Sequence, residues 1–172
     1  MSPRNARSLG SAIVGGVTAL VFFRLGLLFW VGIVGWVAFA EAEGDSSPLM
    51  RVICSGVFGA VVGWGGIVTS LLIPVPADGW LWVPRLAVAV AISLYVLEWG
   101  TQFEALSRRA AAYLGYAGVF GATALALASL TGISQFIDPH LSNPLIGTVI
   151  AFMGGALAGS ARRSMTSALS KG

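Results

Sequence analysis

The stretch FFRLGLLFW, residues 22–30, places one arginine inside an apolar run that extends from Leu9 to Ala40. As a single helix this run would be about 48 Å long, at about 1.5 Å per residue. That length exceeds a hydrocarbon core of roughly 30 Å even with ordinary tilt. Divided at Arg24, the run gives two helices of about 15 residues, which are short but workable with local thinning or snorkelling ends. Arg24 is therefore either a charge inside the membrane or the turn between two crossings.

The composition excludes a soluble globular domain. The chain has 172 residues, of which 56% are hydrophobic and only 10% charged, and its mean hydropathy is +0.86. Soluble domains carry about 25% charged residues, so this chain has too few charges to cover a globular surface. Apolar segments close to the roughly 20 residues that a bilayer requires recur along it. The sequence predicts an all-α, polytopic membrane protein with a single transmembrane domain over residues 1–172.

Turn residues bound the later spans. PVPADGW, residues 74–80, closes one span, and ISQFIDPHLSN, residues 133–143, forms a loop before another. Pro144 suits the first turn of a helix, where its missing N–H costs nothing. The six predicted spans cover residues 9–23, 25–40, 52–73, 81–99, 110–132 and 144–161.

Positive charges select the number of spans and their orientation, because Lys and Arg concentrate on the cytoplasmic side. Five spans would leave Arg24 at mid-membrane, at a cost of at least about 2.5–3.5 kcal/mol. Six spans with both termini inside leave only Arg24 and Arg85 outside, and Arg24 then sits in a tight outer turn with its guanidinium at the headgroups. The residues placed inside are Arg4, Arg7, Arg51, Arg108, Arg109, Arg162, Arg163 and Lys171. The pI of about 9.6 thus reflects topology rather than nucleic-acid binding.

The N-terminus imitates a signal peptide, since Arg4 and Arg7 precede an apolar run and AFA at residues 38–40 offers a cleavage site. The apolar region is far too long for a signal h-region. We expect the first segment to be a retained membrane anchor.

The segment LGLLFWVGIVGWVAFA, residues 25–40, resembles the second-helix region of DUF1097, a bacterial family of small inner-membrane proteins. The resemblance covers the layout from Gly10 to Ala161, with about six short, glycine-rich spans and an acidic or polar loop after the second. No activity is established for that family, so the resemblance implies the architecture and supplies no catalytic residue.

Small residues recur every four positions in three of the predicted spans. Such stripes let helix backbones approach closely in lipid. They either pack the six-helix bundle internally or form contacts between the subunits of a homo-oligomer. The stripes are Ser55, Gly59 and Gly63; Gly118, Ala122 and Ala126; and Ala151, Gly155 and Gly159.

The pentapeptide GVFGA occurs twice, at residues 56–60 and 118–122. In the six-span arrangement both copies run from inside to outside, which would fit parallel repeats of a two-helix hairpin. Parallel repeats occur among transporters, although a chain this rich in Gly, Val and Ala also produces such a match by chance.

Three polar motifs are interpreted as structural. EAEGDSS, residues 41–47, resembles a solvated loop more than a cation site, because it lacks the ligand pattern of a calcium loop. DPH, residues 138–140, offers too few ligands for zinc and is predicted to be a turn with a capping aspartate. Glu104, four residues before Arg108, predicts an ion pair in a short interfacial helix.

We expect no enzyme, metal or cofactor. The sequence has no nucleophile beside a base, no metal-ligand cluster and no phosphate-binding loop. Haem would need axial ligands that one histidine and scattered methionines hardly supply. Cys54 is the single cysteine, so no intrachain disulfide forms.

The function we predict is a homo-oligomeric channel or facilitator for a small neutral or weakly polar solute, since mid-membrane carboxylates that a proton-coupled pump would use are scarce. The transport path would be a narrow seam in each protomer. The alternative is a non-transporting scaffold or accessory subunit, in which tryptophans fill space beside glycines and Glu98 is an ordinary interfacial carboxylate; internally buried glycine stripes would favour it. The predicted path residues are Trp36, Trp64 and Thr69 within the seam, Glu98 and Trp99 at its inner mouth and Arg24 near its outer mouth.

Overall fold

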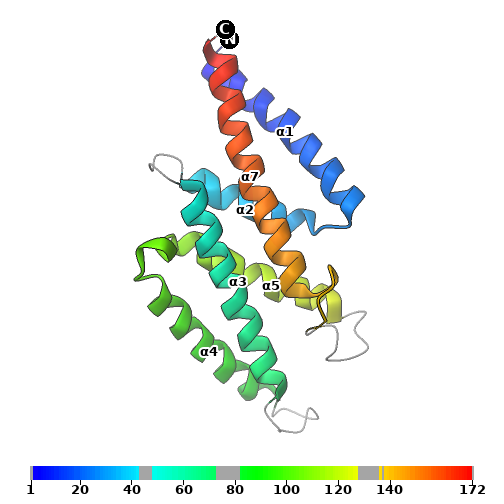
Figure 1. Ribbon diagram of the computed structural model, residues 1–172, viewed down its shortest axis with the longest axis vertical. Helices are drawn as coiled ribbons and strands as arrows, with labels where there is room; N and C mark the ends of the chain where they lie inside the picture. The colour runs from blue at the N-terminus through cyan, green and yellow to red at the C-terminus, as the bar shows by residue number, and fades with distance from the viewer. Residues whose placement is uncertain (1, 43–47, 73–81, 128–135, 137, 172) are drawn as a thin grey trace.

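The structure is a computed structural model that describes residues 2–42, 48–72, 82–127, 136 and 138–171. In these residues the chain is all-helical, as the sequence predicts, with six α-helices and one 3₁₀ turn (Figure 1). The elements are α1 (Pro3–Leu25), α2 (Phe29–Glu41), α3 (Pro48–Leu72), α4 (Trp82–Gly100), η1 (Glu104–Leu106), α5 (Arg109–Leu127) and α7 (Pro144–Lys171). The helices that are long and apolar enough to cross a membrane are Arg4–Leu25, Pro48–Leu72, Val83–Gly100 and Pro144–Ser170, and Phe29–Glu41 is a shorter apolar helix.

The long N-terminal apolar run is divided into two helices, but the break lies at Gly26–Leu28 and not at Arg24, which remains within α1. Gly26 has a φ of 67° and its N–H donates to the carbonyl oxygens of Phe22 and Phe23, which ends α1. Glycine adopts this left-handed conformation without a steric penalty. Arg24 is exposed in the last turn of α1, where a positive charge interacts favourably with the helix dipole. The predicted division of the run into two helices is confirmed.

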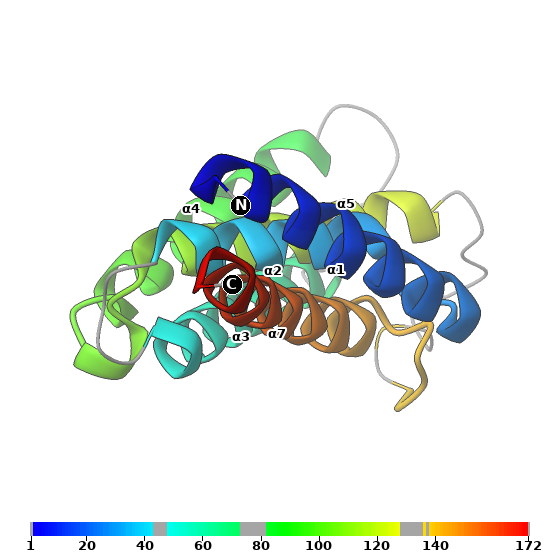
Figure 2. The same cartoon turned by 90° about the horizontal axis from the view of Figure 1, so that it is seen from above.

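Two helix pairs form the centre of the molecule. α3 packs most extensively on α5, and α2 packs most extensively on α7. α1 lies along α7, with the N- and C-termini together at one end, and α4 lies along α3 (Figures 1 and 2). By contrast, α1 scarcely contacts α2, and α4 scarcely contacts α5. Helices that follow one another in the sequence are therefore often not the helices that pack together.

Glycine permits the close approach within both central pairs. A Cβ atom at Gly59 or Gly155 would overlap a carbonyl oxygen of the facing helix. Every small residue predicted to form a stripe is buried inside the protomer, except that the side chain of Ala126 lies outside the described part. These buried residues are Ser55, Gly59, Gly63, Gly118, Ala122, Ala151, Gly155 and Gly159.

Helix α7 extends further than the predicted span. It continues beyond Ala161 to Lys171 because its later half packs on α1 rather than ending at the first charges. A Cβ atom at Gly10 would lie 3.1 Å from Oγ1 of Thr166, and Arg162 is buried.

Two local predictions are corrected. Residues 104–106 form one 3₁₀ turn rather than an interfacial helix, and Glu104 accepts a 2.8 Å hydrogen bond from Arg51 instead of pairing with Arg108. The pairing differs because α5 begins only at Arg109, so residues 104 and 108 do not share a helix.

The start of α7 has a different cap from the one predicted. Oδ1 of Asn143 accepts a 2.9 Å hydrogen bond from the N–H of Leu145. Asp138 acts through its carbonyl oxygen, which accepts from the N–H of His140 (2.8 Å) and from the side-chain amide of Asn143 (3.1 Å). Asparagine is as good a helix cap as aspartate and directly precedes Pro144, which begins the helix as predicted. The predicted loops at residues 43–47 and 74–80 lie outside the described residues.

The two copies of GVFGA have different surroundings. A Cβ atom at Gly56 would overlap the ring of Phe152, whereas one at Gly118 would lie 3.1 Å from the methyl group of Thr148. The packing therefore gives no support to the parallel two-helix repeat.

Candidate functional site

Two clefts lie at opposite ends of the α2–α5 pair: one between the end of α2 and the start of α5, and the other among the α1–α2 link, α5 and residues 141–147. The Asn143 cleft, of about 240 Å³, is found where α2 begins and α5 ends; the Glu41 cleft, of about 250 Å³, is found where α2 ends and α5 begins. α2 and α5 are therefore antiparallel. The Asn143 cleft is lined by Gly26, Leu27, Leu28, Ala122, Leu141, Ser142, Asn143, Pro144 and Gly147, and the Glu41 cleft by Ala38, Glu41, Ala42, Ser107, Arg108, Arg109, Ala110 and Ala111.

The Asn143 cleft has a neutral polar lining held in place by hydrogen bonds. The side-chain amide of Asn143 is buried and donates to the carbonyl oxygens of Phe136 (2.9 Å) and Asp138 (3.1 Å). Ser142 Oγ lies 3.1 Å from Nδ1 of His140. Because the amide of Asn143 is already engaged on both sides, it fixes the shape of this mouth.

The Glu41 cleft has a charged lining. Glu41 and Arg109 are exposed, and Arg108 is half-buried. The backbone N–H of Arg108 donates to Oγ of the fully buried Ser55 (3.2 Å), which ties the start of α5 to α3. Nε of Arg109 also lies 3.8 Å from a carboxylate oxygen of Glu98. One carboxylate and two guanidinium groups therefore surround this mouth.

The region between the clefts is packed. A Cβ atom at Gly121 would lie 2.5 Å from the indole ring of Trp30, close to the Asn143 cleft. Further in, Gly118 faces both Val31 and Thr148. The Thr148 hydroxyl is fully buried and has no hydrogen-bond partner among the described residues. An unsatisfied buried hydroxyl costs about 1–3 kcal/mol, which makes it a candidate contact for a solute.

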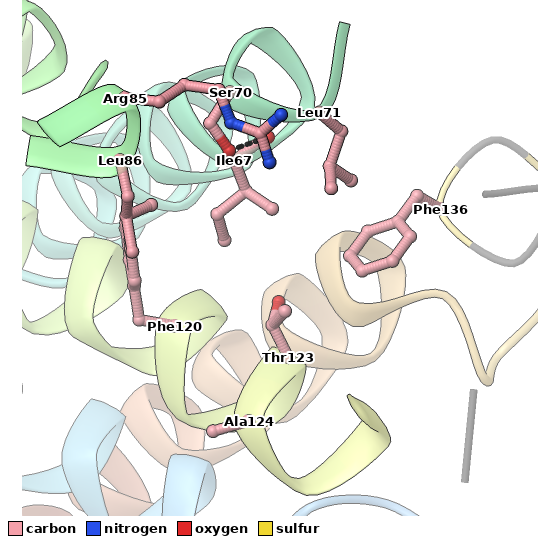
Figure 3. A pocket seen from close by; sticks show the side chains of 9 residues that line it. All are labelled: Ile67, Ser70, Leu71, Arg85, Leu86, Phe120, Thr123, Ala124 and Phe136. Carbon is pink, nitrogen blue, oxygen red and sulfur yellow. Dashed lines mark hydrogen bonds between the residues drawn. The ribbon is translucent and has the colours of Figure 1, made fainter. Parts of the chain in front are cut away.

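A third cavity, of about 270 Å³, lies among the end of α3, the start of α4 and the end of α5. In Figure 3 the guanidinium group of Arg85 lies beside Ser70, whose hydroxyl donates to the carbonyl oxygen of Ile67 (2.7 Å). The buried hydroxyl of Thr123 points into the cavity and has no partner among the described residues. The other lining residues, Leu71, Leu86, Phe120, Ala124 and Phe136, are apolar.

The two tryptophans predicted to line a seam face different neighbours. Trp36, on α2, has a ring atom 3.9 Å from where a Cβ of Gly15 on α1 would lie. Trp64, on α3, donates from Nε1 to the carbonyl oxygen of Phe136 (3.1 Å) and packs against a buried cluster that includes Phe136. The structure does not bring them to one cavity.

The remaining predicted path residues are also dispersed. Thr69 lines a groove of about 240 Å³ between α3 and α4. Glu98 and Trp99 share a shallow pocket, where Glu98 accepts a 2.7 Å hydrogen bond from Tyr113 and Trp99 packs edge-on against Phe103. Arg24 is exposed at the end of α1.

Sequence reasoning missed the polar residues that line the cavities. Asn143 could have been found, because an asparagine directly before a proline is a typical helix cap. The sequence indicates Arg85 only as one of the charges that set the topology. Thr123 and Thr148 carry no sequence signal, since single threonines are common in membrane helices.

Neither a curated protein nor a solved structure matches the chain significantly. A family model described as "Protein of unknown function (DUF1097)" matches residues 8–167, which is nearly the whole chain. The chain therefore belongs to the DUF1097 family.

Proposed function

We propose that the protein is a bacterial inner-membrane facilitator that lets a small neutral or weakly polar solute cross between α2 and α5. The observation that carries this proposal is the pair of clefts at opposite ends of these two helices. A conduit needs a mouth at each membrane face, and an antiparallel helix pair with a cleft at either end provides both. This path replaces the tryptophan seam that the sequence favours.

The proposal includes six crossings with both termini in the cytoplasm. Alternation of the helices then places the Glu41 cleft inside and the Asn143 cleft outside. The Arg51–Glu104 ion pair (2.8 Å) supports this, because it holds the start of α3 and the α4–α5 connection at the same end. Arg108 and Arg109 lie at that end as well, and cytoplasmic ends are rich in positive charge.

The solute class follows from the packed region between the clefts. Small residues and one buried hydroxyl, that of Thr148, surround the path there. Glycine leaves little bulk in the way of a solute, and a lone hydroxyl suits a neutral hydrogen-bonding group better than an ion. The charged side chains of the Glu41 cleft lie at its mouth and would select or orient the solute.

One observation favours the alternative, a non-transporting scaffold or accessory subunit. The small-residue stripes are buried inside the protomer wherever the structure describes their side chains.

A homo-oligomer, which we also propose, would use exposed apolar surface such as the outer face of α4, where Val88, Ile92 and Tyr95 are exposed. Light scattering of the detergent-solubilised protein gives the oligomeric state.

Solute flux into proteoliposomes tests the proposal, with urea and glycerol as probes. In a background carrying Cys54→Ala, single variants Ser142→Cys and Glu41→Cys place a thiol in either cleft, and Thr69→Cys serves as a control in the α3–α4 groove. A bulky, membrane-impermeant thiol reagent applied from the periplasmic side should block flux through Ser142→Cys and spare the other two. Applied from the cytoplasmic side, it should block only Glu41→Cys.

The central contact is tested separately. Thr148→Val keeps the side-chain shape and removes the hydroxyl, so flux should fall roughly 2- to 10-fold, the equivalent of one hydrogen bond. The matched control is Thr123→Val, which should leave flux unchanged. If the wild-type protein carries neither probe faster than empty vesicles do, the facilitator fails and the scaffold takes its place.

A further inference from the structure

The close contacts between α2 and α7 have counterparts between α5 and α3. In each case a glycine on one helix faces a backbone carbonyl oxygen on the other, so the backbones nearly touch. Three such contacts between α2 and α7 match three between α5 and α3. The matched pairs are Gly155–Gly32 with Gly59–Ala112, Gly35–Phe152 with Gly115–Gly56, and Gly159–Trp36 with Gly63–Tyr116.

The same two shifts of residue number relate all of these contacts. One constant shift of residue number relates α2 to α5, so that Gly35 corresponds to Gly115 and Trp36 to Tyr116. The other converts α3 into α7, taking Gly59 to Gly155, and it also aligns the prolines that begin both helices. Because three contacts obey the same two shifts, the correspondence concerns the whole helix pairs and is not a coincidence of glycine-rich sequence.

The outer helices fit the same scheme. α1 lies along α7, and α4 lies along α3. The ring of Phe22 on α1 packs against Gly154 of α7, where an added Cβ atom would lie 3.0 Å from the ring. The ring of Phe58 on α3 packs against Gly100 of α4 in the same way. Gly154 and Phe58 correspond under the shift that relates α7 to α3. In the α1–α7 contact the phenylalanine lies on the first helix of a repeat and the glycine on the third, whereas in the α4–α3 contact the glycine lies on the first helix and the phenylalanine on the third.

We propose that the chain consists of two three-helix repeats, α1-α2-α3 and α4-α5-α7, which exchange their third helices. Each third helix packs on the first two helices of the other repeat, which is the arrangement visible in Figure 1. In the described residues each repeat has three apolar helices, and three crossings of a membrane bring the chain to the opposite face, so the second repeat begins at the opposite end of the molecule from the first. The repeats are inverted relative to each other.

A two-fold axis relates the repeats. Gly56 and Phe152 correspond to each other and are in contact, so the axis passes between them. The clefts lie on either side of it and are equivalent: Ser107 and Ala42 of the Glu41 cleft correspond to Leu27 and Ala122 of the Asn143 cleft. The axis therefore crosses the α2–α5 pair between the two mouths.

Inverted repeats of this kind allow two conformations of the protein. In the second conformation each repeat adopts the conformation that the other repeat has in the first. We infer that the α2–α5 seam opens alternately, at the Glu41 cleft in one conformation and at the Asn143 cleft in the other. This step rests on the proposed function, whereas the repeat itself rests on the contacts alone. The glycine crossings act as the pivots, because bare backbones can slide with little change in side-chain packing.

Cross-linking of equivalent positions tests alternate opening in the full-length protein carrying Cys54→Ala. The double variant Leu27→Cys/Ala122→Cys spans the Asn143 cleft, and its counterpart Ser107→Cys/Ala42→Cys spans the Glu41 cleft. Thr69→Cys/Ile92→Cys, across the α3–α4 groove, is the control. Each protein is joined by a short bifunctional thiol reagent, and amide hydrogen exchange and solute flux are then measured.

Closing the Asn143 cleft should increase hydrogen exchange around the Glu41 cleft, and closing the Glu41 cleft should increase it around the Asn143 cleft. Both cross-links should abolish flux, and the control should change neither measurement. Exchange that fails to respond reciprocally would overturn alternate opening, even if flux shows that the protein conducts. Reciprocal exchange in a protein without measurable flux would support the inverted repeat while contradicting the facilitator, so the two failures are distinguishable.

Discussion

At the scale of single residues, the room around each glycine differs greatly along α3. A Cβ atom at Gly59 would overlap the carbonyl oxygen of Ala112, whereas one at Gly65, on the same helix, meets nothing within 4 Å. Gly59 is therefore required by the α3–α5 crossing, and Gly65 is not. This contrast gives a matched pair of substitutions.

We predict that Gly59→Ala destabilises the protein by roughly 1–3 kcal/mol, because the methyl group forces two backbones apart. Gly65→Ala should be neutral or stabilise by up to about 1 kcal/mol, because alanine favours a helix. Chemical unfolding of both variants in detergent, followed by circular dichroism, measures the difference. Equal stabilities for the two variants would mean that α3 and α5 are not in backbone contact at Gly59.

At the scale of elements, the turn between α1 and α2 depends on the conformation of one residue. Gly26 has a φ of 67°, and it is the one described residue with positive φ. An L-residue in this conformation costs roughly 1–2 kcal/mol. Gly16, within α1, is helical and has open space around it.

We predict that Gly26→Ala lowers the free energy of unfolding by roughly 1–2 kcal/mol, whereas Gly16→Ala leaves it unchanged or raises it by up to about 1 kcal/mol. The physical reason is that alanine disfavours the left-handed cap but favours the helix interior. Hydrogen exchange at residues 24–28 should increase only in Gly26→Ala. Unaltered exchange there would show that the turn does not need a positive φ.

At the scale of the whole molecule, the exchanged third helices make each half of the chain depend on the other. α3 packs on α4 and α5, and α7 packs on α1 and α2. Neither half has its own central helix pair. The protein therefore cannot be divided into two self-sufficient units.

We predict that fragments 1–77 and 78–172, expressed together in one membrane, associate and co-purify. Each fragment expressed alone should be degraded or aggregate, because its glycine-lined third helix has no partner. Affinity purification through a tag on one fragment, with detection of the other, measures this. Gly59→Ala in the first fragment should weaken association and Gly65→Ala should not; recovery of stable separate fragments would contradict the exchange.

The sequence alone predicted the features that depend on composition and on local backbone chemistry. Low charge and high hydropathy indicate membrane helices, the charge of Arg24 indicates a break in the N-terminal apolar run, and Pro144 begins α7. These signals are local, since each depends on one residue's conformational preference or charge, or on the average polarity of a segment. The positions of the small-residue stripes were likewise readable from their spacing.

The tertiary structure alone decided which helices meet and where the clefts lie. In lipid, the hydrophobic effect does not determine which helices pack together, and any stripe of small residues can pack against any other. The pairing of α3 with α5 and of α2 with α7 therefore leaves no pattern in the sequence. The repeat is also hidden there, because Phe58 and Gly154 occupy equivalent positions with opposite bulk. The backbone contacts of the glycines on α3, α5, α2 and α7 show that the two positions correspond, because those contacts obey the same two shifts of residue number.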